Sequence, residues 1–156
     1  MNKTNAMRIL DKLKIEYKII EYDTADGLID GMNVAEKTGL SPSRLCKTLV
    51  CRGKEGHYVY ILPVNASLDL KAAAHAANEK KIEMLPQKDL KALTGYVHGG
   101  CSPLGMKKAF PTYIDAAVKQ HERISVSGGA IGIQIQLNPL DLQRSIDAQF
   151  AELTQK

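Results

Sequence analysis

Residues 95–105, with the sequence GYVHGGCSPLG, constrain the fold of this chain more than any other segment. Glycines and a proline cluster here around a small polar residue, and a simple turn needs fewer of these turn-forming residues. The adjacent Gly99 and Gly100 allow the chain to bring bare backbone N–H groups close to a ligand. A loop of this kind can hold a developing oxyanion, so the segment is a candidate functional site.

Hydrophobic periodicity predicts helices and short strands that do not alternate regularly along the chain. Helices are expected over residues 7–13 after a cap at Thr4, and over 34–38, 68–77 and 86–93, with Gly39 and Gly95 following two of them. Strands are expected over residues 17–22, 45–52, 58–63, 81–85, 96–98, 112–115, 124–127 and 131–137.

The last expected strand alternates in polarity. Ile131, Ile133, Ile135 and Leu137 fall on one face, and Gln134 and Gln136 fall on the other. This alternation predicts one buried face and one solvated face. Asn138 then caps an expected terminal helix, whose apolar stripe comprises Leu142, Ile146, Phe150 and Leu153.

This order of elements favours the α+β class, with a mixed, mainly antiparallel sheet that curls like a barrel and is surrounded by helices. A length of 156 residues predicts one domain over residues 1–156. Hydrophobic residues make up 44% of the chain, which is enough to fill one sizeable core.

The formal net charge of +4 tilts the surface towards anionic partners. The sequence has no run of about 18 apolar residues, so no membrane span is expected. Residues 1–4 lack the apolar core of a signal peptide. A cytoplasmic protein without membrane contact is therefore the expectation.

Familiar catalytic and metal-binding motifs do not fit. The glycines of residues 128–132 precede an expected strand, whereas a dinucleotide-binding loop needs a helix there. The four histidines show no metal-ligand spacing, and Cys46, Cys51 and Cys101 form no Cys-x-x-Cys pair. Reduced, packed cysteines and the absence of a metal or cofactor are expected.

Two further elements supply parts of a polar site. Lys47 lies in an otherwise apolar strand, where alternation places it with Leu45 and Leu49 on a face that is not evidently solvated. The segment 125–129, with the sequence SVSGG, adds hydroxyls and more backbone N–H groups. Such groups can bind a polar or anionic substrate. The sequence shows no protein nucleophile paired with a base.

The chain resembles the YbaK/EbsC family of aminoacyl-tRNA deacylases, which is related to the editing domain of bacterial prolyl-tRNA synthetases. The resemblance spans nearly the whole sequence and is carried by Lys47-Thr48-Leu49, residues 94–108 (TGYVHGGCSPLGMKK), Val126-Ser127-Gly128-Gly129 and residues 138–142 (NPLDL). One departure is visible. Family members often have an aromatic residue immediately before the glycine that matches Gly31, and Asp30 occupies that place here.

The resemblance implies a compact α+β fold and hydrolysis of the ester between a wrong amino acid and tRNA, above all cysteine on the proline acceptor. It implies a catalytic role for Lys47 and for the backbone of Gly99 and Gly100. It also implies substrate-binding parts for a second set of residues: Tyr22, Thr48, Ser102, Pro103, Ser127, Gly128 and Gly129.

In this family the cysteinyl substrate is thought to supply its own thiol as the nucleophile. A free thiol has a pKa of about 8.5, so a thiolate is accessible near neutrality. The enzyme then needs to hold a reactive conformer and to stabilise the oxyanion. We expect Lys47 to orient the terminal ribose or phosphate, and Cys101 to be dispensable.

The expected partners are the acceptor end of a mischarged tRNA and a prolyl-tRNA synthetase that presents it, because one small domain cannot also read a distant anticodon. Two alternatives stay open. The same fold could act on another acyl group, such as alanine, with water as nucleophile. The chain could instead be a non-catalytic module that binds tRNA or a synthetase. The sequence gives no indication of oligomeric state.

Overall fold

The computed structural model describes residues 2–155; Met1 and Lys156, the ends of the expected domain, lie outside the described residues. Five α-helices are formed in this part of the chain: α1 (Asn5–Lys12), α2 (Gly31–Thr38), α3 (Leu70–Ala76), α4 (Leu90–Thr94) and α5 (Pro139–Ser145). Two short 3₁₀ turns, η1 (Gln87–Asp89) and η2 (Ala116–Gln120), accompany them. The helices predicted from the sequence are thus all present, with shifted ends.

Local chemistry sets the helix ends. The Thr4 side chain accepts a hydrogen bond from Met7 N at the start of α1, as its place before the apolar repeat predicts. Asp30, Asp69 and Asn138 cap α2, α3 and α5 in the same way. Gly39 and Gly95 end α2 and α4 in the left-handed conformation, with φ of 71° and 86°.

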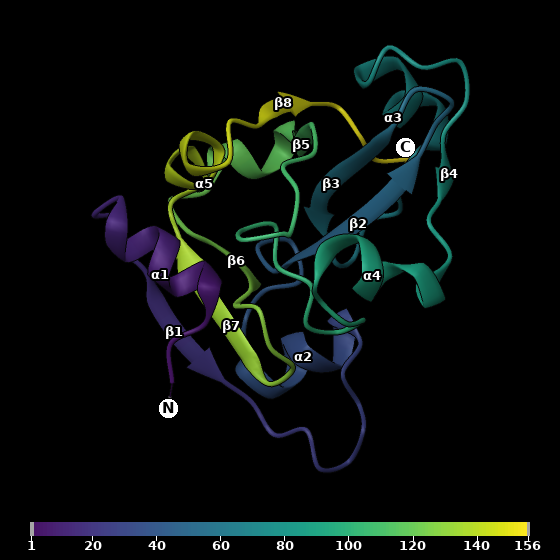
Figure 1. Cartoon of the computed structure of the whole chain (residues 1–156). Coiled ribbons are helices and arrows are strands. Elements are labelled where there is room, and N and C mark those ends of the chain that lie inside the picture. The colour runs from purple at the N-terminus through teal and green to yellow at the C-terminus, as the bar shows by residue number, and fades with distance from the viewer. Residues whose placement is uncertain (1, 156) are drawn as a thin grey trace.

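The strands form two sheets in the described residues (Figure 1). In the first, β7 (Ile133–Leu137) lies between β1 (Lys18–Glu21) and β6 (Ile124–Ser127), and both pairings are antiparallel. The second has the order β4-β2-β3-β5-β8, built from β4 (Glu83–Met84), β2 (Cys46–Arg52), β3 (His57–Pro63), β5 (Thr112–Asp115) and β8 (Gln149–Ala151).

The second sheet is mixed. The hairpin of β2 and β3 is antiparallel with Lys47 opposite Leu62, and β4 adds to β2 antiparallel. The β3–β5 and β5–β8 pairings are parallel. A parallel bridge between Leu45 and Ser125 joins the start of β2 to β6. The α+β class and the mainly antiparallel pairing are therefore confirmed, but the strands form two joined sheets, not a closed barrel.

The first core is aliphatic, whereas the second also contains tyrosines. The first core lies between α1 and the three-stranded sheet and includes Met7, Leu10, Ile135 and Leu137, all fully buried. The second lies between the hairpin and α3, where Tyr60 donates from its hydroxyl to Ala73 O at 2.8 Å. The C-terminal segment runs beside this second core (Figure 1), where Leu68 and Thr154 form a bridge.

Two expected elements are wrong. Residues 96–98 do not form a strand, because a turn over residues 97–100 begins there, in which Gly100 N donates to Val97 O at 3.0 Å. The terminal helix ends at Ser145, and Asp147 adopts a φ of 52° that turns the chain back. Phe150 then lies in β8, beside β5, and not on a helix.

Candidate active site

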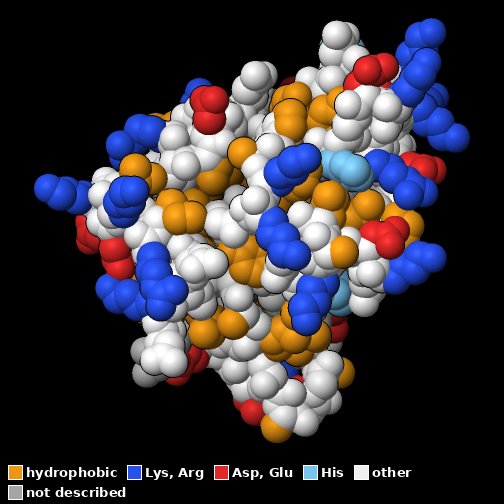
Figure 2. Space-filling view, in the orientation of Figure 1, with side chains coloured by type: hydrophobic (Ala, Val, Ile, Leu, Met, Phe, Trp, Pro, Cys, Tyr) orange, Lys and Arg blue, Asp and Glu red, His pale blue; other side chains and the backbone are white. Residues whose placement is uncertain are grey.

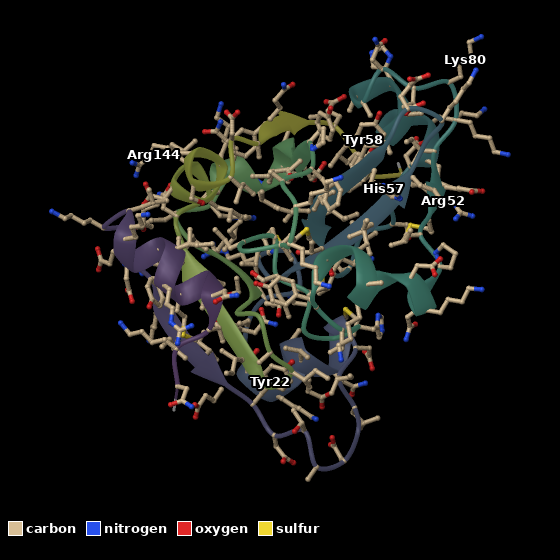
Figure 3. The ribbon with its side chains drawn as sticks, viewed as in Figure 1. Tyr22, Arg52, His57, Tyr58, Lys80 and Arg144 are labelled. Carbon is tan, nitrogen blue, oxygen red and sulfur yellow. The ribbon has the colours of Figure 1, made fainter. Side chains whose placement is uncertain are left out.

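A pocket of about 220 Å³ opens where the two sheets meet, and we call it the site pocket. It is lined by Tyr22, Ile29, Asp30, Gly31, Val34, Leu45, Cys46, Lys47, Thr48, Leu49, Val64, Leu90, His98, Gly99, Cys101, Ser127 and Gln134. Tyr22, just after β1, is labelled in Figure 3 near the end of β7. The fold thus brings five residues of the expected site to one cavity: Tyr22, Lys47, Thr48, Gly99 and Ser127.

Lys47 is half-buried on β2, and its ammonium donates to the backbone oxygen of Ala66 at 2.6 Å. Partial burial lowers the pKa of Lys47, because removal from water disfavours the charged form. One hydrogen bond leaves the other donors of the ammonium available. The side chain is therefore held at the pocket wall with donors left for an oxygen of a ligand.

The glycine loop begins with a tight turn over residues 97–100. Gly99, the third residue of this turn, has a φ of 86°, which glycine adopts without steric cost. The Gly100 N–H is used within the turn by Val97 O. The N–H of Gly99, which lines the site pocket, makes no hydrogen bond with residues 2–155. Of the two glycines, Gly99 is thus the one that lines the pocket and has an N–H without a partner among residues 2–155.

Four residues of the expected site support this wall from outside the pocket lining. Ser102 is fully buried, and its Oγ accepts from Leu104 N at 3.2 Å. Pro103 is buried beside it. Gly129 N donates to Ser127 Oγ at 3.3 Å, and Gly128 O accepts from the Thr4 hydroxyl at 2.5 Å. These contacts shape the two loops and leave the pocket surface to other residues.

The pocket contains two cysteines, and burial raises the pKa of both thiols. The pKa of Cys46 rises to about 12 and that of Cys101 to about 11. Both thiols are therefore protonated near neutral pH, and a thiol is a much weaker nucleophile than a thiolate. Neither has the low-pKa environment of a catalytic cysteine.

The loop between β1 and α2 covers one side of the pocket. Lys37 of α2 holds this loop by donating to Asp23 O at 2.8 Å, Asp26 Oδ1 at 2.6 Å and Leu28 O at 2.9 Å. Asp30 accepts from Asn33 N at 3.1 Å and starts α2. Its carboxylate is thus used for helix capping at the pocket rim, which gives a structural reason for its presence.

Gln134 was missed by the sequence analysis, which placed it on a solvated face. It is only 6% exposed and lines the site pocket, opposite Ser127 in the β6–β7 register. The expected solvated face is wrong at this residue, because Gln134 is buried at a pocket that it shares with residues of β2 and of the 97–105 loop. The sequence offers no signal that would have found Gln134. Its alternation with Ile133 and Ile135 places it on the opposite face of the strand, but does not indicate whether that face is buried.

A second hollow of about 660 Å³ lies at the far end of the β2–β3 hairpin, near Arg52 and Lys80 (Figure 3). It is an open surface around Glu79, whose carboxylate accepts from Lys54 N, Glu55 N and the Tyr58 hydroxyl. These bonds fix the hairpin turn. The smaller site pocket is the better candidate, because its lining contains polar groups that have no hydrogen-bond partner among residues 2–155, namely Thr48 Oγ1, Gln134 Oε1 and the Gly99 N–H.

Basic side chains surround apolar ones on the face shown in Figure 2. Among residues 2–155, no group of three or more His, Cys, Asp or Glu side chains is placed to hold a metal ion. No helix in that range is long and apolar enough to cross a membrane.

Comparison with solved structures shows the fold first. One, described as a "putative trans-editing enzyme for prolyl tRNA synthetase", superposes with a TM-score of 0.86 at 22% identity and covers 100% of both chains. Another, the hypothetical protein APE2540, superposes with a TM-score of 0.89 at 17% identity and covers 97% of this chain and 100% of its own. The chain thus has the α+β fold of these two structures.

Sequence comparison then shows the family. The profile of the aminoacyl-tRNA editing domain matches residues 32–145. A protein of Enterococcus faecalis named "Putative Cys-tRNA(Pro)/Cys-tRNA(Cys) deacylase EbsC" is 46% identical over 155 residues, covering 99% of this chain and 94% of the relative. The chain belongs to the aminoacyl-tRNA editing domain family, and the resemblance to the YbaK/EbsC group is confirmed. Aminoacyl-tRNA deacylation is the enzyme class of this family.

Proposed function

We propose that this protein removes cysteine from mischarged tRNA(Pro), with the thiol of the cysteinyl group as the nucleophile. The observation that carries the proposal is a pocket that holds Lys47 and the free Gly99 N–H but only protonated cysteines of its own. The cysteine specificity is supported by the name of the E. faecalis relative, which is 46% identical.

The proposed reaction starts with loss of the thiol proton of the substrate to solvent. The cysteinyl sulfur attacks the carbonyl carbon of its own ester, and a C–S bond forms. The ester C–O bond then breaks, the terminal ribose oxygen takes a proton, and the amino acid leaves as a cyclic thioester that water opens to cysteine. Because attacking and attacked atoms belong to one residue, the pocket gains rate by holding a reactive conformer.

Two groups of the pocket have roles in this reaction. The N–H of Gly99 donates to the oxyanion that develops on the carbonyl oxygen; removing one such donor typically costs about 10²–10³ in kcat. The Lys47 ammonium, held by Ala66 O, orients the terminal ribose or its phosphate. Neither role requires a protein base.

The proposed partners are the tRNA acceptor end and a prolyl-tRNA synthetase that presents it. A pocket of about 220 Å³ accommodates an aminoacyl group with part of the ribose and leaves the body of the tRNA outside. The pocket by itself therefore offers no means of telling one tRNA from another. Without the synthetase, Cys-tRNA(Pro) and Cys-tRNA(Cys) should be deacylated at similar rates, and added synthetase should favour the first.

The experiment is deacylation of Cys-tRNA(Pro) by the wild type, Lys47→Ala and the control Lys18→Ala, which changes an exposed lysine of β1. Wild type and Lys18→Ala should be equally active, and Lys47→Ala should lose on the order of 10²-fold in kcat/KM. Equal rates for Lys47→Ala and wild type would remove Lys47 from the site.

Ala-tRNA(Pro), tested in parallel, should be stable because alanine has no thiol. Hydrolysis of both esters at the same rate would show that water is the nucleophile. Binding of Cys-tRNA(Pro) without turnover would make the protein a binding module and contradict the proposed activity.

A further inference from the structure

The side-chain amide of Gln134, in the lining of the site pocket, has an oxygen without a hydrogen-bond partner among residues 2–155. The residue is 6% exposed. Its backbone pairs with Ile20 of β1 on one side and with Ser127 of β6 on the other, so the strand around it is fully integrated into the sheet. The side-chain amide alone is left to act on a ligand.

A buried polar atom without a partner is unfavourable, and native proteins contain few of them. The Oε1 atom itself is sealed from solvent, but rotation about the last torsion of the side chain exchanges the places of Oε1 and Nε2. The amide can therefore turn its oxygen towards the pocket. Thr48 Oγ1, in another residue of the pocket lining, is also buried without a partner among residues 2–155.

The polar groups of the pocket lining differ in whether they already have hydrogen-bond partners. Its ionisable side chains, besides the two cysteines and Tyr22, are Asp30, Lys47 and His98. The Asp30 carboxylate accepts from both Asn33 N and Asn33 Nδ2, and Lys47 is a donor. Tyr22, His98 and Ser127 also carry atoms that can accept a hydrogen bond. Gln134 Oε1 and Thr48 Oγ1 are the buried side-chain oxygens of this lining that have no partner among residues 2–155, so a donor-bearing group of the substrate would satisfy them.

We propose that Gln134 accepts a hydrogen bond from the α-amino group of the aminoacyl ester, with Thr48 as a second acceptor. This inference rests on the proposed function and deepens it. Every aminoacyl ester carries this amino group next to the reacting carbonyl, and it is the donor that does not depend on the side chain of the amino acid. The contact positions the carbonyl relative to the Gly99 N–H.

The proposal defines a substrate class. Esters with a free α-amino group are accepted, and esters whose nitrogen is acylated are rejected, because an acyl group removes donors and needs space inside a small pocket. Formylated and peptidyl esters of tRNA are therefore protected from this enzyme, whatever their side chain.

The test compares Gln134→Met with Gln136→Met. Methionine keeps the length of glutamine and removes the amide. Gln136 lies on the same strand, opposite Lys18 and Ser125, and does not line the pocket, so it is the matched control. The substrates are Cys-tRNA(Pro) and 3-mercaptopropionyl-tRNA(Pro), which has the thiol but lacks the α-amino group.

Gln134→Met should lose at least about tenfold in kcat/KM on the cysteinyl ester, as expected for one hydrogen bond to a charged group. It should lose nothing on the 3-mercaptopropionyl ester, and Gln136→Met should match the wild type on both. An equal loss on both esters in a protein with unchanged circular dichroism would overturn the proposal, since the amide would then serve something other than the amino group.

A binding measurement separates this inference from the proposed activity. The probe is 3′-deoxy-3′-(cysteinylamino)adenosine, an amide that cannot undergo ester cleavage, compared by calorimetry with its 3-mercaptopropionyl counterpart. The wild type should bind the first more tightly, and Gln134→Met should bind both equally. A wild type that binds with this preference but does not deacylate would sink the proposed function alone. Equal binding of both probes by the wild type would sink the role of Gln134.

Discussion

Gly100 lies against the backbone of Ile131 so closely that a Cβ on residue 100 would come within 2.9 Å of Ile131 N. The same atom would lie 3.2 Å from the carbonyl carbon of Ala130. The 97–105 loop and the 128–132 loop are thus packed backbone to backbone. This contact, between segments about thirty residues apart in the sequence, places Gly99 and Ser127 on the same cavity.

Gly100→Ala should therefore reduce both stability and activity. Its φ lies outside the left-handed region, so the added methyl acts by collision, and overpacking of this kind costs about 1–3 kcal/mol. Urea unfolding gives the change in stability, and deacylation of Cys-tRNA(Pro) gives the change in activity. Gly56→Ala is the control, because its Cβ would meet nothing nearer than 3.9 Å. A Gly100→Ala protein as stable and active as the control would show that the two loops move apart freely.

Cys101→Ala should keep most of the deacylase activity, within roughly twofold, because the buried thiol is protonated and has no nucleophilic task. The loss of one buried sulfur should cost about 1 kcal/mol of stability, as for a small apolar group. Single-turnover deacylation and chemical unfolding measure the two effects. Near-total loss of deacylation in a folded Cys101→Ala protein would contradict the substrate-thiol mechanism.

Lys37→Met should loosen the loop that covers the pocket, because Lys37 Nζ bonds three oxygens between Asp23 and Leu28. Loss of hydrogen bonds to a charged donor, worth about 1.5–3 kcal/mol, should speed amide hydrogen exchange in residues 23–28 at least tenfold. KM for Cys-tRNA(Pro) should rise more than kcat falls. Lys12→Met, on an exposed part of α1, is the control. Unchanged exchange in the loop would mean that contacts other than those of Lys37 hold it in place.

Glu79→Gln should lower the melting temperature at pH 7. The hydrogen bond from Tyr58, and then those from Glu55 N and Lys54 N, lower the pKa of Glu79 below its ordinary value of 4.5. A carboxylate whose pKa is lower in the folded state contributes stability above its unfolded pKa and loses it as the pH falls through the folded pKa. The difference between wild type and variant should therefore be full at neutral pH and vanish in acid.

Thermal unfolding at several pH values from 7 down to about 3 measures this difference. Glu122→Gln, an exposed carboxylate outside the hairpin, should melt like the wild type throughout. A Glu79→Gln deficit that persists unchanged in acid would show that shape, and not charge, fixes the hairpin turn.

The local structure could be predicted from the sequence where short-range chemistry decides it. The Thr4 cap, the Gly39 and Gly95 helix ends and the β2–β3 hairpin each depend on neighbours within a few residues. The motif residues could be found for the same reason, since glycine pairs and an isolated lysine are visible without a fold. Their chemical parts in the site stay predictions.

The tertiary structure decided everything that depends on which surface covers another. Phe150 and Leu153 satisfy helical spacing, but a left-handed residue at Asp147 and the free edge of β5 place the chain in β8 instead. Residues 96–98 have strand-like composition, yet the Gly100 N–H closes a turn there. Gln134 shows the same principle, because strand alternation defines two faces, and only the tertiary structure decides that the second face is buried at Gln134. Most candidate residues of the site could be named from their local motifs, whereas their gathering in one pocket depends on how the two sheets meet, because that contact joins residues far apart in the chain.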